Sequence, residues 1–395
     1  MQNEQWSNED AALGDKLPYT FQAADSVCWT EATDSTNALV ARVVRQRLQQ
    51  QDGNDLRDLT AGLFDRESAA AIMASETQQG EGRIVLGGYA EAAEGTEFAD
   101  TESAESGAGV DTAKQALFSP HHRAHVDYAC NHNDVVAALL AQMGVATVQL
   151  DQLPTQVPIS VALADTQTAG RGRLGRAWYN RAGESFIASY VAAVPKSLIT
   201  GERSGWLTMA AGLAVVDALG HELTNSPALE LDPSADITLK WPNDVFLIGR
   251  KLGGILTELT ASNDDQAVVT FGIGLNLLVD PSRLPTREST SLQLHYAPLP
   301  SHEELRDRLA AGIATALRVR LSALASWPDR IAERMRQEVT ARSWTLGRRV
   351  VARLAQGGAV EGRAESINAD ASLTIRLDDG GIQTVTTGDV GVLPE

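Results

Sequence analysis

Three glycines alternate with three arginines ahead of a tryptophan in the stretch Gly170-Arg171-Gly172-Arg173-Leu174-Gly175-Arg176-Ala177-Trp178. Glycine lets the backbone turn tightly and present its N–H groups to a ligand. Arginine carries a fork of donors that fits carboxylate and phosphate oxygens. The stretch therefore predicts a clamp for an anion, with a flat ring nearby for a base or an apolar group. A Gly/Arg surface turn or an RNA-binding tract would also fit these residues alone.

The residues around this loop narrow its interpretation. Residues 157–165 predict a β-strand that leads into the loop. The loop is not a P-loop, because no Gly-Lys-Ser/Thr follows it. It also does not match the strict dinucleotide fingerprint that opens a helix.

Four further motifs strengthen the prediction of an anion site. They are Asp34-Ser35-Thr36-Asn37, Lys240-Trp241-Pro242-Asn243-Asp244-Val245, Lys251-Leu252-Gly253-Gly254-Ile255-Leu256-Thr257-Glu258 and Gly272-Ile273-Gly274-Leu275-Asn276. In this order, with Gln167-Thr168-Ala169 leading into the loop, they resemble the bacterial biotin–protein ligases. The resemblance covers about residues 25–50 and 155–395, with a long unmatched stretch between.

Length and composition predict a globular chain with more than one domain. At 395 residues a single core is not expected, and the hydrophobic content of 43% is enough for a globular fold. The two cysteines, Cys28 and Cys130, argue against a disulfide framework and favour a reducing compartment. We see no signal-peptide pattern and no run of about 18 apolar residues, so the predicted location is the cytoplasm.

The net charge of −18 is concentrated in one segment. Between Asp52 and Asp111 there are 14 acidic and 3 basic residues, a net charge of −11, which leaves −7 for the rest of the chain. An acidic surface disfavours nonspecific nucleic-acid binding. Only about 25 residues precede the first motif, too few for the helix-turn-helix domain of the repressor members. We therefore expect no specific DNA binding, and no membrane association.

The N-terminal part is predicted to hold an arm, a strand, a helix and an insertion. Residues 1–24 are weakly patterned, which predicts a mobile arm. A strand is expected at 26–31, and a helix that Asp34 or Ser35 can cap should follow to about residue 48. The acidic stretch at about 50–150 predicts a partly disordered insertion. Within it we expect a helix near 67–75, a strand at 84–86 and a helix over 134–143, and we expect a Gly/Ser linker in place of 52–111 to leave the fold intact.

A cluster of histidines in the insertion has two interpretations. The cluster consists of His121, His122, His125, Cys130 and His132. A metal site is one interpretation and a solvated loop is the other. The spacings match no zinc signature, which favours the solvated loop.

The rest of the chain alternates strands with two long helices and ends in short strands. Ser204 should cap one helix, and a capping box of Ser301 and Glu304 should open another. Strands are expected at 185–194, 237–241, 245–248, 254–260, 268–278, 350–354, 360–367, 373–377 and 382–386, with a hairpin turn at 378–381.

The resemblance implies an α/β (α+β) architecture. The catalytic domain, residues 25–343 with the insertion, would have a mixed sheet and be related to class II aminoacyl-tRNA synthetases. Residues 344–395 would form a small SH3-like β-barrel.

The resemblance also assigns roles to individual residues. Biotin would be bound by Ser35, Thr36, Asn37, Gln167, Arg171, Gly172, Arg173, Lys240 and Gly254, and ATP by Arg176, Trp178, Asn243, Lys251 and Asn276. Lys240 and Arg173 would be catalytic, because a carboxylate and an α-phosphate repel each other and need cationic charge between them. The implied substrates are biotin, ATP with Mg²⁺ held mainly by its phosphates, and a lysine of a biotin carboxyl carrier domain of acyl-CoA carboxylases. No protein metal site is expected.

Three other functions remain open from the sequence. A lipoate–protein ligase shares the fold and the adenylation chemistry that the resemblance implies. A biotin-sensing DNA-binding repressor is less favoured, because of the short N-terminal arm and the acidic charge. An inactive carrier-binding module is disfavoured by the intact Lys240, Arg171 and Arg173.

Overall fold

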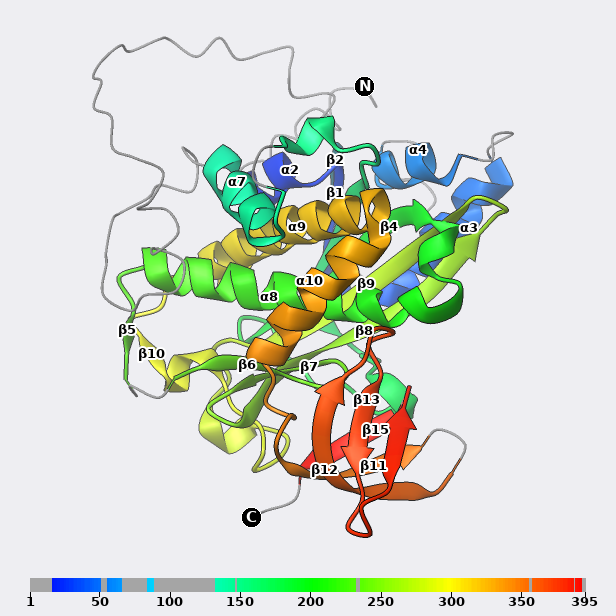
Figure 1. The fold of residues 1–395 in the computed structure, drawn as a ribbon. Helices are drawn as coiled ribbons and strands as arrows, with labels where there is room; N and C mark the ends of the chain where they lie inside the picture. Colours follow the sequence, from blue (N-terminus) through cyan, green and yellow to red (C-terminus); the bar gives the residue numbers. More distant parts are fainter. Residues whose placement is uncertain are drawn as a thin grey trace, which may run out of the picture.

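The structure is a computed structural model that describes residues 16–50, 55–65, 84–88, 132–145, 148–231, 235–354, 357–386 and 388–392. This part of the chain forms a large mixed sheet with helices on both faces and a smaller C-terminal sheet beside one end of it (Figure 1). The expected α/β class with a mixed sheet is confirmed.

The large sheet has eight strands in the order β2-β1-β3-β4-β9-β8-β7-β6. The pair β1 and β3 is parallel, and each of the other neighbouring pairs is antiparallel. The strands are β1 Ser26–Thr33, β2 Ile84–Gly88, β3 Ile159–Gln167, β4 Ser185–Pro195, β6 Ile237–Lys240, β7 Asp244–Leu247, β8 Arg250–Ser262 and β9 Gln266–Asn276.

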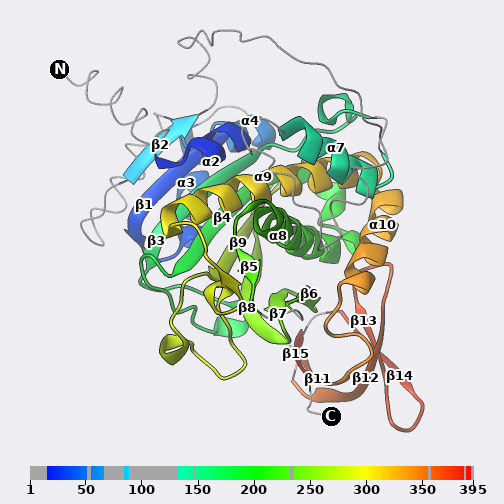
Figure 2. The ribbon, with the colours of Figure 1, turned by 90° about the vertical axis from the view of Figure 1, so that its left-hand side faces the viewer.

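Neighbouring side chains along each strand point to opposite faces of the sheet, which divides the interior into two hydrophobic layers. Ala162 and Val191 pack with α3 Thr36–Gln50 and α4 Leu56–Ala61 on one face. Their neighbours Val161 and Ala192 belong to the core on the opposite face. There the helices are α2 Pro18–Ala23, α7 His132–Gln142, α8 Gly205–Asn225 and α9 His302–Ser326. Successive strand side chains point to opposite faces, so both faces of the central strands are buried (Figure 2).

The central helix α9 is apolar enough to resemble a membrane span. An 18-residue window has a mean hydropathy of 1.3, but 83% of that window is buried inside the protein. Within the described ranges, α9 is the one helix that meets these length and hydropathy criteria. A helix that is hydrophobic all round is often the core of a larger protein, and the burial of α9 shows that it has this role here.

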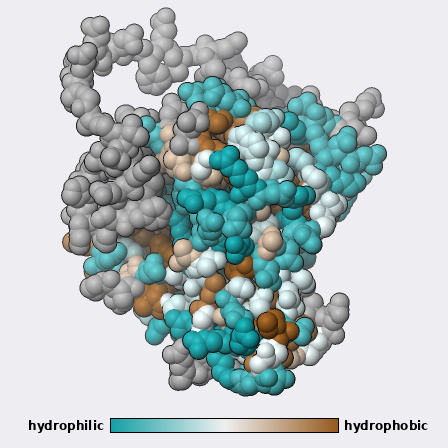
Figure 3. All heavy atoms as spheres, viewed as in Figure 1, coloured by the Kyte–Doolittle hydropathy of each residue, from teal (hydrophilic) through white to brown (hydrophobic). Residues whose placement is uncertain are grey.

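Helix α10, Pro328–Ala341, follows α9 and was not expected from the sequence. Its inner side buries Ile331, Met335 and Val339, while Glu333 and Arg334 are exposed. Figure 3 shows a mainly hydrophilic surface where α10 crosses this face. The helix is thus amphipathic and leads the chain toward the C-terminal sheet.

The C-terminal sheet has five antiparallel strands in the order β14-β13-β12-β11-β15. They are β11 Arg349–Leu354, β12 Ala359–Ile367, β13 Leu373–Arg376, β14 Ile382–Val385 and β15 Gly388–Val392. The expected turn is confirmed, because Leu377 N–H donates to Gly381 at 2.8 Å and Gly380 has φ +84°. Strand β15 was not expected.

The predicted arm is wrong for residues 16–24, which pack into the domain that contains the large sheet. Leu17 is fully buried. Asp307 of α9 accepts hydrogen bonds from Tyr19 N at 3.0 Å, Thr20 N at 2.8 Å and Thr20 Oγ1 at 2.6 Å. These bonds attach α2 to the central helix, while residues 1–15 lie outside the described chain.

Three pieces of the predicted insertion also belong to the domain. In the segment that contains α4, Leu56, Leu59, Leu63 and Phe64 are buried. Strand β2 pairs with β1, and α7 buries Leu139 and Leu140 in the core. The structure therefore argues against replacing all of 52–111, because replacement would remove buried apolar side chains and an edge strand.

Several other expectations have mixed outcomes. The strand near 84–86 and the helix over 134–143 are confirmed as β2 and α7. Ser204 precedes α8, but its side chain makes no capping hydrogen bond. The Ser301 hydroxyl does cap α9, accepting from Glu304 N–H at 3.2 Å. The helix near 67–75 and the cluster of His121, His122, His125 and Cys130 lie outside the described residues, as does the His132 side chain.

We expect Leu59→Ala to lower the free energy of unfolding by about 2–5 kcal/mol, because it leaves a cavity under α4. Leu48→Ala is the matched control, since Leu48 is 39% exposed on α3, and should change stability by no more than about 0.5 kcal/mol. Urea unfolding of both variants makes the comparison. Equal losses would show that α4 is not part of the cooperative core.

Candidate active site

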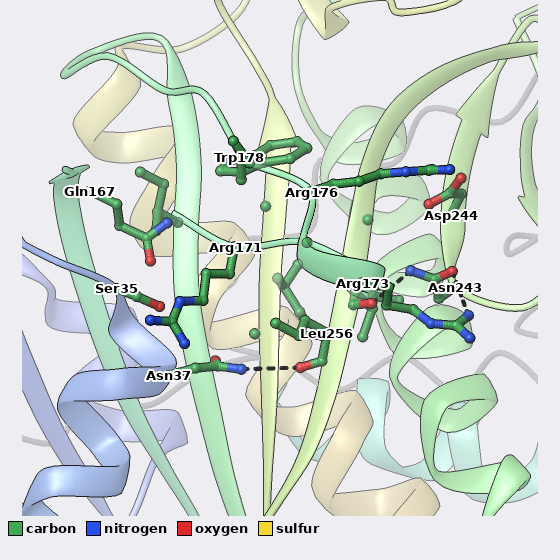
Figure 4. Close-up of a pocket in the computed structure, with 18 of the residues that line it drawn as sticks. Ser35, Asn37, Gln167, Arg171, Arg173, Arg176, Trp178, Asn243, Asp244 and Leu256 are labelled. Atoms are coloured by element: carbon green, nitrogen blue, oxygen red, sulfur yellow. Dashed lines mark hydrogen bonds between the residues drawn. The ribbon is translucent and has the colours of Figure 1, made fainter. Parts of the chain in front are cut away.

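A cavity of about 120 Å³ lies where the N-terminus of α3 meets the Gly/Arg loop and the sheet. It is on the α3 side of the sheet and spans β4, β9, β8 and β7 (Figure 4). Most of the predicted site residues line it: Ser35, Thr36, Asn37, Gln167, Arg171, Gly172, Arg173, Arg176, Trp178, Asn243, Lys251 and Gly254. The structure therefore brings together all five motifs that the sequence singled out, apart from the two residues discussed below.

The Gly/Arg loop is folded back on itself. Trp178 N–H donates to the Gly170 carbonyl at 2.8 Å, and Gly172 N–H donates to the Arg176 carbonyl at 2.7 Å. The tip is a short 3-10 turn at Arg173–Gly175, in which Leu174 has φ +57° and Gly175 has φ +73°. Glycine adopts this left-handed region at little cost, whereas leucine does so rarely. The loop is thus a tight hairpin whose base is fixed and whose tip is exposed.

One end of the cavity is lined mainly by hydroxyl and amide side chains, toward which Arg171 also extends (Figure 4). Gln167 Oε1 accepts from Thr36 N–H at 2.7 Å. The Ser189 hydroxyl on β4 lies 2.7 Å from Thr36 Oγ1 and donates to Asn37 Oδ1 at 2.6 Å. Asn37 Nδ2 in turn donates to Glu258 at 2.6 Å and to the Leu256 carbonyl at 3.3 Å. This network fixes the start of α3 against β3, β4 and β8.

Asp34 supports the start of α3 from outside the cavity. Its carboxylate accepts from Ser35 N–H at 2.7 Å and forms two hydrogen bonds with Arg42, at 2.8 and 3.0 Å. Burial alone would raise the pKa of this carboxyl, but the bonds from Arg42 and Ser35 outweigh it and hold the pKa below its usual range. The anionic form of Asp34 therefore stabilises this turn.

Two glycines of β9 form part of the wall and make room for neighbouring side chains. A Cβ atom on Gly272 would lie 2.4 Å from Asn37 Oδ1, and one on Gly274 would lie 2.5 Å from Trp178 Cε2. Larger residues at either position would therefore displace Asn37 or Trp178. The Trp178 indole N–H is buried and has no hydrogen-bond partner within the part of the chain that the structure describes. Trp178 thus lies flat over the strand with a donor left for a ligand.

The other end of the cavity is charged. Arg173 donates to Asn243 Oδ1 at 3.0 Å. Asp244 Oδ1 lies 2.7 Å from Lys251 Nζ, and its other oxygen lies 3.4 Å from Lys240 Nζ. Figure 4 shows Arg176 extending toward Asp244, while Arg171 extends toward Ser35 and Asn37. Arg173, Arg176 and Lys251 line this end together with the single carboxylate of Asp244, which gives it a net positive charge.

Two predicted residues do not line the cavity. Lys240 is the cross-strand partner of Asp244 and lies one strand further out, against a separate small cavity beside α8. Its charge reaches the main cavity through the contact with Asp244. Asn276 is buried and donates to the Thr290 carbonyl at 2.9 Å, so the structure gives it a role in holding the loop that follows β9.

The sequence analysis missed several residues of the cavity. Asp244, Gly272 and Gly274 were part of quoted motifs but were given no role. The alternation of glycines in Gly272-Ile273-Gly274 was the signal for an open face on one strand. No sequence signal pointed to Ser189, or to Gly388 of β15, which lines the cavity from the C-terminal sheet. Among the described residues, no group of three or more His, Cys, Asp or Glu side chains could hold a metal ion.

The chain is similar in sequence to several known protein ligases. Residues 145–276 match the Biotin/lipoate A/B protein ligase family. The biotin–[acetyl-CoA-carboxylase] ligase of Mycobacterium tuberculosis is 36% identical over 231 residues, which cover 58% of this chain and 77% of the relative. The ligase of the same name from Paracoccus denitrificans is 36% identical over 159 residues, covering 38% of this chain and 60% of the relative.

A solved structure of the biotin protein ligase from Aquifex aeolicus, in complex with biotin and ATP, covers 60% of this chain and 89% of its own, with 23% identity and a TM-score of 0.43. The family match over residues 145–276 gives the class, a protein ligase of the biotin/lipoate type. The extent of the match to the M. tuberculosis protein shows that this chain belongs to the biotin–[acetyl-CoA-carboxylase] ligase family.

We expect Asp34→Asn to lower the free energy of unfolding by about 1 kcal/mol at pH 7, because the hydrogen bonds to a charged acceptor weaken. The pKa of Asp34 is lowered in the fold, so its contribution is present above the unfolded pKa of about 3.9 and is lost as pH falls through the folded pKa. The difference between variant and wild type should therefore shrink in acid. Asp264→Asn in the exposed β8–β9 turn is the charge-matched control. A pH-independent difference for Asp34→Asn would contradict this account.

Proposed function

We propose that this chain is an ATP-dependent biotin–protein ligase, which forms biotinyl-5′-AMP and transfers biotin to a lysine of a carboxyl carrier domain. The observation that carries the proposal is the two-ended cavity, with most of its hydroxyl and amide groups at one end and most of its cations at the other. Membership of the ligase family supports the choice of substrates.

The end lined by hydroxyl and amide side chains suits the ureido ring of biotin. That ring offers one hydrogen-bond acceptor and two donors, which short hydroxyl and amide side chains can satisfy. Gln167 Oε1 is already occupied by Thr36, so its amide group is the donor for a carbonyl, while the Ser35 hydroxyl can accept from an N–H group. Figure 4 shows both side chains facing the same space.

The charged end suits the meeting of a carboxylate with an α-phosphate. The biotin carboxylate oxygen would attack the α-phosphorus of ATP, forming a C–O–P bond as the bond to pyrophosphate breaks. Arg171, Arg173 and Lys251 line the path between the two ends, and Lys240 adds charge behind Asp244. Fixed cations of this kind stabilise the negative charge that develops during the reaction.

The second step would transfer the acyl group. The carrier lysine, as a free amine, attacks the carbonyl carbon of the mixed anhydride, AMP leaves with both bonding electrons, and the new amide loses a proton. No covalent intermediate with this chain is needed.

Entry of both substrates requires movement of the Gly/Arg loop. The cavity of about 120 Å³ is smaller than the roughly 300–1,000 Å³ typical of ligand pockets. The loop is fixed at Gly170 and Trp178 and exposed at Leu174, so its tip is the part able to move outward. Closure of the tip over the adenylate would exclude water.

The remaining expectations are part of this proposal. Mg²⁺ would accompany ATP and be held mainly by its phosphates, whose charge it would neutralise. The relation to class II aminoacyl-tRNA synthetases, the SH3-like nature of the five-stranded C-terminal sheet and the cytoplasmic location are proposed on the same basis.

The first test of this proposal is substrate-dependent exchange. We expect the purified full chain to exchange pyrophosphate with Mg·ATP when biotin is added. Lipoate should not replace biotin, because its dithiolane ring has no N–H or carbonyl group for the polar end. Exchange with lipoate alone would assign the chain to the other branch of the biotin/lipoate class.

The second test is Lys240→Ala. Loss of this cation should lower the adenylation rate at least tenfold, because charge near a desolvated phosphate contributes roughly 2–4 kcal/mol. Lys196→Ala is the matched control, since Lys196 bonds the Asn263 carbonyl at 2.6 Å at the far end of β4. Wild-type adenylation by a folded Lys240→Ala protein would exclude the role.

The third test is Gly274→Ala. The new Cβ would meet the indole of Trp178 at about 2.5 Å, so the ring should shift and nucleotide affinity should fall. Gly220→Ala on α8 meets no atom within 4 Å and has no left-handed φ, so it should bind as wild type. Calorimetric titration with ATP distinguishes them, and equal affinities would place Trp178 outside the nucleotide site.

A further inference from the structure

The segment that joins α10 to the C-terminal sheet runs beside the edge strand β6. We refer to Arg342–Thr345 as the linker segment. Leu239 N–H donates to the Arg342 carbonyl and Trp344 N–H donates to the Leu239 carbonyl, both at 2.8 Å. Trp241 N–H donates to the fully buried Thr345 hydroxyl at 2.9 Å. Lys240 therefore lies between Leu239 and Trp241, and the backbones of both residues are hydrogen-bonded to the linker segment.

The same segment supports the hairpin between β7 and β8. The Trp344 ring packs against Gly249, where a Cβ would lie 2.5 Å from Cη2. Phe246 lies 6.2 Å from Trp344 between ring centroids, and the Arg348 guanidinium stacks 3.5 Å from the Trp344 centroid. This hairpin carries Asp244 at one end and Lys251 at the other, so Trp344 stabilises the element that presents the charged end of the cavity.

A turn of the C-terminal sheet fixes the outer side of this region. Two buried tryptophans donate their indole N–H groups to it: Trp241 to the Ala371 carbonyl at 2.8 Å and Trp206 to the Ala369 carbonyl at 2.6 Å. A buried donor that loses its acceptor is costly, so these bonds hold the turn against β6. Both the linker segment and the C-terminal turn thus converge on the residues flanking Lys240.

We propose that the linker segment is a positioning element for the ATP end of the site, with Thr345 and Trp344 as positioning residues for Lys240 and Asp244. The proposal rests on the function proposed above for the identity of the ligand, and it assigns control of nucleotide binding to residues outside the cavity. The biotin end is built mainly from α3, β3 and β4, which lie away from the β6 edge of the sheet, although Asn37 also bonds to β8. The two substrates should therefore respond differently to a change in it.

The test compares Thr345→Val with a variant that removes another buried hydroxyl group far from the linker segment. Val keeps the shape of Thr but removes the acceptor of Trp241 N–H. The matched control is Ser322→Ala, which removes a fully buried hydroxyl that accepts from Val157 N–H at 2.9 Å in α9. Thr345→Ser restores the hydroxyl and serves as the rescue variant.

We expect Thr345→Val to raise the KM for ATP about tenfold, since small misplacements of reacting groups carry penalties of this size or larger. The Kd for biotin should stay within about twofold of wild type, and amide hydrogen exchange should accelerate over residues 238–247. Ser322→Ala should lower the melting temperature by a similar amount without either effect, and Thr345→Ser should return the KM for ATP to near wild type.

Four results would overturn the proposal: an unchanged KM for ATP, equal losses for ATP and biotin, the same exchange pattern in Ser322→Ala, or no rescue by Thr345→Ser. Hydrogen exchange does not depend on activity, so it tests the positioning role even if the wild-type protein proves to use another acyl substrate. Failure of wild type to bind biotin would count against the proposed function and leave the exchange comparison decisive for the linker segment.

Discussion

The contact between Asn37 and the bare backbone at Gly272 is the constraint on which the site depends. Asn37 can lie flat on β9 only because position 272 has no side chain. From there its amide reaches Ser189 on β4 and Glu258 on β8, which joins the first turn of α3 to two strands that are more than 150 residues away in sequence. The network of Asn37, Ser189 and Thr36 at this end of the cavity depends on that packing arrangement.

The charged end follows a different principle, in which one carboxylate organises several cations. Asp244 contacts Lys240 and Lys251 at once, so neither lysine has to be held in place by apolar packing alone. Removing cations from water is costly, and a shared carboxylate offsets part of that cost. The arrangement keeps a net positive charge at this end of the cavity while the shared carboxylate stabilises the lysines.

The sequence predicted the site better than it predicted the boundaries of the domain. The motifs were sufficient to predict which residues gather at the cavity, because these combinations of residue types serve few purposes other than ligand binding. The arginines spaced by glycines at 170–176 are an example. The sequence did not predict as well where each residue lies in the fold. Lys240 was expected in the cavity, yet the strand order places it one strand further out.

The errors in the N-terminal part have a common physical cause. Leu17, Leu59 and Phe64 lie in short segments with weak periodicity and polar or acidic neighbours, so local composition suggested mobility. Their burial depends on strands and helices encoded far along the chain, which no local pattern can report. Helix α10 was missed for the opposite reason, because its charged face outweighed its three or four buried apolar side chains.

The attachment of α2 to Asp307 also has a consequence for how the chain matures. Thr20 and Asp307 are 287 residues apart in the sequence, so α2 cannot dock on α9 until Asp307 has left the ribosome. Contacts of such long range slow folding, and apolar surface stays uncovered meanwhile. During synthesis of this protein, Leu17 and the inner strands therefore remain exposed until α9 has been made. In that interval the chain is most prone to bind chaperones or to aggregate.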